Sequence, residues 1–290
     1  MTISEEIRQK MLAFQKNEIT EYHIYRRLAR IVGSPENQRI LEEIAEDELR
    51  HYGQWREYTQ QDVAPSRLNI WKYYLISRVF GYTFGVKLME RGEEDAQESY
   101  EQLSDVVPLA KTLILEENQH EEALLQMLDE ERLRYTGSMV LGLNDALVEL
   151  TGALAGLTLA LQDTNLIALT GSITGIAAAL SMGASEYLST KTEETDKNPF
   201  RASIYTGGAY IITVLILILP YLVLENYYLC LACTLAAAVI IIALFNYYIS
   251  VAKDEPFRRR FLEMAGLSLG VAAFSFLVGF LLRSFLDVDI

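Results

Sequence analysis

Two segments of the chain carry a glutamate followed three residues later by a histidine: Glu48 precedes His51, and Glu117 precedes His120. Residues three apart on an α-helix share a face, so each pair presents a carboxylate and an imidazole together. A single pair on a charged helix is typical of a solvated face. Two pairs at matching places in a helix bundle instead predict two metal ions, each with a nitrogen ligand, bridged by carboxylates.

Four predicted helices position these pairs. Hydrophobic periodicity predicts the first over Ile3–Val32 and the second from Pro35, and the fourth begins near Pro108. Because the first and third carry carboxylates and the second and fourth carry the Glu-x-x-His pairs, the pattern reads as a duplicated helix pair. The additional carboxylates are Glu18 on the first helix and Glu90, Glu93 and Glu94 on the third.

An aromatic segment, Arg67–Tyr82, connects the second and third predicted helices. Its tryptophan, tyrosines and phenylalanines admit two interpretations. One is a crossover that packs in the core of the bundle; the other is a stretch that rests on a membrane interface.

Residues 1–135 resemble the ferritin-like domain of rubrerythrin and its relatives, on the spacing of Glu18 to Tyr25, the segment Ala45–His51 and the Glu90-x-x-Glu93 pattern. The resemblance implies a four-helix bundle with a di-iron site. The implied iron ligands are Glu18, Glu48, His51, Glu90, Glu93, Glu117 and His120. Glu94 replaces Glu93 if the register shifts by one residue, and His23 falls outside the motif and is expected to be structural. The four-cysteine electron-transfer iron of peroxidase-type rubrerythrins has no counterpart here.

Composition divides the 290 residues into two predicted domains, 1–135 and 136–290. Acidic residues concentrate in the first, and glycines and long apolar runs in the second. The formal net charge of −14 argues against nucleic acid as a partner, because phosphate binding needs a basic surface. The N-terminal residues lack the pattern of a cleavable signal peptide, so the first domain is expected to stay in the cytoplasm.

The second domain contains five apolar runs long enough to cross a bilayer as helices. The predicted spans are Met139–Leu161, Leu166–Leu188, Ile204–Leu224, Tyr228–Val251 and Phe261–Phe285. Basic residues concentrate in the loops around Lys197 and Arg258, whereas the intervening turns lack them. The positive-inside rule then places these loops and the N-terminal domain in the cytoplasm and the C-terminus outside.

The first two predicted spans carry polar groups. Asp145 and Glu149 are four residues apart on the first, and Met182 and Glu186 are four apart on the second. A carboxylate inside a bilayer is costly unless it faces a cavity or a partner, so these residues indicate a functional site. The alternative is that Asp145 and Glu149 make packing hydrogen bonds.

Small residues in the spans have expected packing roles. Gly152-x-x-x-Gly156 and Gly171-x-x-x-Gly175 are expected to let the first two spans approach closely. Cys230 and Cys233 are expected to pack as small apolar residues, with a soft-metal contact as the alternative.

Two segments, Gly142–Val148 and Ser181–Ser189, resemble the signature segments of the vacuolar iron transporter family. The resemblance implies a five-span transporter of ferrous iron, commonly in exchange for protons, and commonly a homodimer. Asp145 and Met182 are the implied pathway ligands, with Glu149 and Glu186 as additional ones. Some members insert a longer acidic helical region between spans two and three, where this chain has only Thr190–Phe200. Fusion to a ferritin-like domain is known among prokaryotic transporters. The resemblance therefore implies that this protein lies in the inner membrane of a prokaryotic cell.

The sequence therefore predicts an all-α protein, with a ferritin-like four-helix bundle followed by a five-helix transmembrane domain. Its predicted function is export of ferrous iron, with a cytoplasmic di-iron domain that collects, senses or oxidises the metal. Manganese transport is an alternative, because oxygen and imidazole ligands suit both ions. A di-iron oxidase or peroxidase that is only anchored in the membrane is the other alternative.

Overall fold

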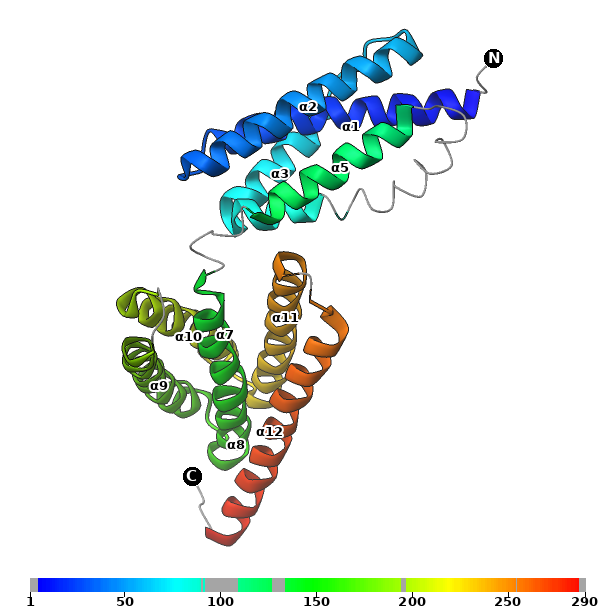
Figure 1. The fold of residues 1–290 in the computed structure, drawn as a ribbon. Helices are drawn as coiled ribbons and strands as arrows, with labels where there is room; N and C mark the ends of the chain where they lie inside the picture. The colour runs from blue at the N-terminus through cyan, green and yellow to red at the C-terminus, as the bar shows by residue number, and fades with distance from the viewer. Residues whose placement is uncertain are drawn as a thin grey trace. The chain divides into compact units, whose positions relative to one another are not determined.

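The computed structural model describes residues 5–89, 91, 109–126, 134–193, 197–253 and 255–286. All regular secondary structure within these ranges is helical (Figure 1). The chain forms two compact units, Met1–Glu130 and Glu131–Ile290, which we describe separately as unit 1 and unit 2.

Unit 1 contains helices whose ends are set by capping residues. Helix α1 spans Glu5–Ala29 and packs along α2, which spans Pro35–Thr59. The Ser34 side chain accepts a hydrogen bond from the backbone N–H of Asn37, and Pro35 occupies the first turn of α2. Backbone N–H groups at the start of a helix have no partner within the helix. Ser34 accepts a hydrogen bond from one of them, and Pro35 has no N–H to satisfy.

Two further helices pack against this pair in unit 1. Helix α3 (Arg67–Phe80) packs against α1, and α5 (Leu109–Gln126) packs against α2. Gly81 separates α3 from the helical residues 82–89 with a backbone φ of 102°, a conformation that L side chains rarely adopt. The ferritin-like arrangement of four helices remains a prediction, since most of the third predicted helix lies outside the described residues.

Unit 2 contains five helices that are long and apolar enough to cross a membrane. The first span, Thr136–Leu161, combines helix α7 (Thr136–Asp145), a π-helical turn η1 (Ala146–Leu150) and helix α8 (Thr151–Leu161). The others are α9 (Thr164–Thr192), α10 (Pro199–Val223), α11 (Tyr227–Lys253) and α12 (Phe257–Leu286). The chain is therefore an integral membrane protein, as the sequence predicted.

Close helix pairs in unit 2 differ from those expected from the glycine motifs. Helix α8 packs mainly along α12, and α9 mainly along α10. A Cβ atom at Gly152 or Gly156 would meet Ser275 of α12, and one at Gly175 would meet Val214 of α10. The expectation that these glycines bring the first two spans together was therefore wrong for three of the four, because small residues do not specify which helix approaches them.

Gly142 makes one of the tightest helix contacts in unit 2. A Cβ atom placed on it would lie 2.2 Å from the backbone oxygen of Thr206 on α10. Because this oxygen belongs to the backbone, rotation of a side chain could not relieve the clash. We expect Gly142→Ala to push α7 from α10 and to destabilise the protein by about 1–3 kcal/mol. Thermal unfolding in detergent measures this change. Gly208→Ala, where nothing lies within 4 Å of the added atom, is the matched control and should unfold like the parent.

Candidate metal centre

Three helices of unit 1 bring carboxylates and imidazoles together in its interior. Helix α1 contributes Glu18, α2 contributes Glu48 and His51, and α5 contributes Glu117 and His120. Glu18, Glu48 and His51 are each at most 2% exposed. Ligand atoms of Glu18, Glu48, His51 and Glu117 all lie within 4.8 Å of one another, close enough to share a metal ion.

Glu48 and Glu117 each lie between the two imidazoles. One oxygen of Glu48 is 3.6 Å from Nδ1 of His51, and its other oxygen is 3.2 Å from Nδ1 of His120. Glu117 has the same relation, at 3.4 Å and 3.5 Å. The two rings are roughly parallel, with centroids 5.8 Å apart. Each carboxylate thus presents one oxygen to each imidazole, which is the arrangement that a bridging ligand between two metal ions requires.

Several potential metal-ligand atoms that face this centre lack hydrogen bonds. The buried Nδ1 atoms of His51 and His120 and the Oε2 atom of Glu48 have no hydrogen-bond partner. The Nδ1 atoms lie 3.2–3.6 Å from oxygens of Glu48 and Glu117 without forming a hydrogen bond. Buried polar atoms without partners are costly, and one explanation for them is an ion that they would bind. The residues present therefore fit a metal ion.

Electrostatics in the centre favour positive charge. Burial disfavours the charged form of His120, but Glu117 and Glu48 outweigh it and raise the pKa of this imidazole to about 10. The pKa of His51 is also raised, because Glu117, Glu18 and Glu48 outweigh its burial. Burial and the charge of Glu117 raise the pKa of Glu48. Protons on the imidazoles and a bound cation are alternative ways to balance these carboxylates.

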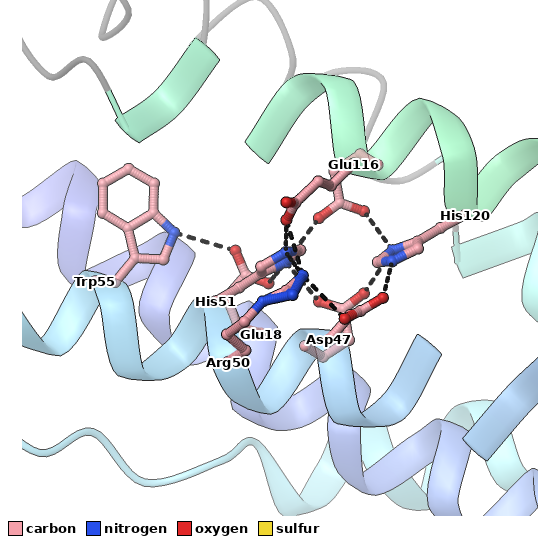
Figure 2. A network of polar contacts seen from close by, with 9 residues as sticks. Glu18, Asp47, Arg50, His51, Trp55, Glu116 and His120 are labelled. Carbon is pink, nitrogen blue, oxygen red and sulfur yellow. Dashed lines mark hydrogen bonds and ion pairs between the residues drawn. The ribbon is translucent and has the colours of Figure 1, made fainter. Parts of the chain in front are cut away.

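Further side chains orient the imidazoles from outside (Figure 2). The Nε2 atom of His51 lies 2.7 Å from Glu116, and that of His120 lies 3.2 Å from Asp47. A carboxylate can only accept here, so each Nε2 donates and Nδ1 of a neutral ring keeps its lone pair toward the centre. Arg50 contacts both outer carboxylates at 2.9 Å and so links α2 to α5.

Glu18 is held by a tryptophan. The indole N–H of Trp55, which is completely buried on α2, donates a hydrogen bond of 3.1 Å to Oε1 of Glu18 on α1 (Figure 2). This contact fixes the orientation of the carboxylate toward His51, whose Nδ1 lies 3.5 Å from the other oxygen.

Outer carboxylates that hold metal-binding histidines affect metal affinity strongly. We expect Asp47→Ala and Glu116→Ala each to weaken metal binding by about 10- to 100-fold, because either change frees one imidazole to rotate. Isothermal titration of the full-length protein with Mn²⁺ measures this loss. Glu43→Ala removes an exposed carboxylate of α2 that pairs with Arg39, and it should leave the affinity unchanged.

The sequence prediction placed seven residues at this centre. The structure brings together Glu18, Glu48, His51, Glu117 and His120, while Glu90 and Glu93, with the alternative Glu94, lie outside the described residues. Sequence reasoning missed Asp47, Arg50, Glu116 and Trp55. A signal existed for two of these, since an acidic residue directly precedes Glu in both Glu-x-x-His pairs. His23, expected to be structural, packs against Tyr22 on α1.

The polar residues predicted in the first two spans contact different helices of unit 2. Tyr210 of α10, which is fully buried, donates a hydrogen bond of 3.2 Å to Glu149. Glu186 on α9 accepts a 2.5 Å hydrogen bond from Ser138 on α7. Met182 packs against the apolar core of unit 2. Within the described residues, the cluster of three or more His, Cys, Asp or Glu side chains lies in unit 1, and Asp145, Glu149 and Glu186 form no such cluster in one chain.

A π-helical turn follows Asp145 in the first span and contains Glu149. It covers Ala146–Leu150. The Ser268 hydroxyl of α12 donates a 2.6 Å hydrogen bond to the backbone oxygen of Leu147 within this turn. π-Helical turns are rare and often occur at functional sites, since they change the direction of side chains without breaking the helix. No residue in this segment signals the turn in the sequence.

Comparison with known proteins connects this segment to a transporter family. The model of the VIT family matches residues 136–196, which include Asp145, Glu149, Met182 and Glu186. The matched segment lies entirely within unit 2. Searches of curated proteins and of solved structures found no match to the chain. Over its first two spans, the chain is thus similar to the VIT family.

Proposed function

We propose that this protein transports ferrous iron, or manganese, across a membrane. The observation that carries the proposal is the VIT family match over the span pair that holds Asp145, Glu149, Met182 and Glu186. Carboxylates in an apolar span attract divalent cations, and a thioether beside them helps to select a transition metal over magnesium or calcium. Glu149 and Tyr210 join the first span to α10, so metal passage would involve a third helix.

Unit 1 is proposed to hold two iron ions that it collects, senses or oxidises. Glu18, Glu48, His51, Glu117 and His120 would hold the ions, with Glu48 and Glu117 each placed between the two imidazoles. Glu90 and Glu93 of the third predicted helix would complete the ligand set. Bound iron would supply one-electron redox chemistry, and the protein's own groups hold the ligands in place: Trp55 orients Glu18, and Asp47 and Glu116 orient the imidazoles.

The proposed direction of transport is export. The loops that join α9 to α10 and α11 to α12 carry the clustered basic residues, which supports a cytoplasmic location for these loops and for unit 1. Unit 1 would then meet iron before it leaves the cell. We further propose exchange for protons, assembly as a homodimer and residence in a prokaryotic inner membrane, all by analogy with the transporters that the sequence resembles.

Flux into proteoliposomes tests this function. Full-length protein is reconstituted in vesicles that contain a metal-sensitive dye, and Fe²⁺ under reducing conditions or Mn²⁺ is added at two opposite pH gradients. Metal-dependent flux that exceeds empty vesicles and responds to the gradient supports a proton-coupled transporter. Absence of flux for both ions, from protein shown to be folded and inserted, would refute transport.

The second candidate function is a membrane-anchored di-iron oxidase or peroxidase. The observation that favours it is the burial of the candidate metal centre, with both potential bridging carboxylates in place between the imidazoles. Under this alternative the five spans serve only as an anchor.

A further inference from the structure

Helix α3 presents a strongly apolar face to the surroundings of unit 1. Leu68 is 78% exposed, Trp71 54%, Leu75 54% and Val79 62%. At 3.6 residues per turn these four side chains fall within an arc of about 80°, so they form one stripe along the helix. We call them the outer face of α3. The opposite side packs inward, where Ile70 and Ser77 are buried.

Basic residues border this stripe on both sides. Arg67 and Arg78 fall along one edge by helical geometry, and Lys72 falls along the other. Residues 63–89 contain no acidic residue, in a chain that has 39 acidic residues and a net charge of −14. The guanidinium of Arg27 on α1 lies 4.8 Å from the centroid of the Trp71 ring and adds positive charge beside the stripe. The segment is thus a basic, apolar region in an otherwise acidic unit.

We propose that α3 lies on the surface of an anionic bilayer and inserts its outer face among the lipid headgroups and upper acyl chains. An amphipathic helix with tryptophan and leucine on one face and Lys and Arg along its borders has the composition of an interfacial helix. Tryptophan is enriched at that depth because its ring is apolar and its N–H is polar. The basic border would contact the phosphates of anionic lipids.

The bilayer is favoured over a second copy of the chain by charge. Two copies that paired through α3 would bring the basic residues beside one stripe against those beside the other, which disfavours the contact. The spans of unit 2 also keep the chain in a membrane, so a lipid surface is present at high effective concentration. The inference needs only this membrane insertion and does not depend on metal transport.

Tryptophan fluorescence of the full-length protein tests the proposal. The chain has two tryptophans, Trp55 and Trp71, both in unit 1, and Trp55 is completely buried. The protein is placed in nanodiscs of phosphatidylcholine and phosphatidylglycerol, with either ordinary or brominated acyl chains. Bromine quenches tryptophan only at close range, so we expect brominated discs to lower the emission. Trp71→Phe should remove the quenched component and leave the Trp55 emission.

Variants of the stripe separate lipid contact from other causes. Leu68→Glu with Val79→Glu should abolish the quenching, while Leu115→Glu, at a leucine of α5 that is 64% exposed, should retain it. The wild-type comparison stands even if the double variant misfolds. Equal emission in brominated and ordinary discs would overturn the proposal, as would a blue shift that grows with protein concentration without quenching, which would indicate a protein partner. Equal quenching in discs of phosphatidylcholine alone would overturn its requirement for anionic lipid.

Discussion

Replacing His51 and His120 together with alanine should remove about two metal ions per chain from the full-length protein. Both imidazoles point their Nδ1 atoms at the same pair of carboxylates, Glu48 and Glu117. Among the described residues, the remaining histidine of the chain, His23, is not part of this cluster. Carboxylates alone bind transition metals less selectively than a mixed set of oxygen and nitrogen donors. Metal analysis after anaerobic loading with Fe²⁺ and dialysis measures the change.

The third histidine offers a matched control for this experiment. His23 lies on α1, packs against Tyr22 and is only partly buried. His23→Ala should therefore keep the parent stoichiometry. Glu48→Gln provides a second variant that keeps the side-chain volume, in case three carboxylates without imidazoles destabilise the helices. Retention of both ions in the double histidine variant, with circular dichroism like that of the parent, would show that the acidic interior is not the metal site.

Much of the candidate metal centre could be predicted because helical spacing alone puts Glu48 beside His51 and Glu117 beside His120. The outer contacts could not be predicted, because Glu116 contacts a histidine on another helix and the distance depends on how α2 and α5 pack. From the sequence, Trp55 is expected only to pack in the apolar core. Its hydrogen bond to Glu18 appears only when α1 and α2 are placed side by side.

The membrane unit shows the same division between local and tertiary information. Apolar run lengths predicted the five spans, since a bilayer fixes the length of a helix that crosses it. The predicted partner helix of Gly152 and Gly156 was wrong. A glycine permits close approach by any helix, and α12 is too distant in sequence for local spacing to identify it. The π-helical turn accepts a hydrogen bond from Ser268, which is distant in sequence from Leu147, so this contact could not be predicted from local sequence.

Helix α3 illustrates a prediction that the sequence left open. The aromatic segment Arg67–Tyr82 suited either a core crossover or a membrane interface. In the structure one side of the helix is buried against unit 1 while Leu68, Trp71, Leu75 and Val79 are exposed. Aromatic content alone could not divide the segment in this way, since the packing of α3 against its neighbours determines which side is covered.

Asp145→Asn should separate a transporter from an anchored enzyme. The substitution keeps the size of the side chain and its capacity for hydrogen bonds, but it removes the charge that could attract a divalent ion or exchange a proton. Under the proposed function we expect metal flux into proteoliposomes to fall by about tenfold or more, equivalent to about 1.4 kcal/mol of lost interaction with the ion. Cells that carry the variant should accumulate iron and become sensitive to it, while unit 1 binds iron as in the parent.

Two comparisons make the Asp145 result specific. Glu263→Gln removes an exposed carboxylate of unit 2 that pairs with Arg259, and it should transport like the parent. Met182→Ala should reduce flux less and change mainly the preference between Fe²⁺ and Mn²⁺, because a thioether contributes selectivity rather than charge.

A protein that is only anchored in the membrane gains nothing from a carboxylate in an apolar span, where the charge is costly. If Asp145→Asn cells handle iron normally while cells with the His51 and His120 replacements fail under peroxide, the spans are an anchor and the protein acts as an oxidase or peroxidase.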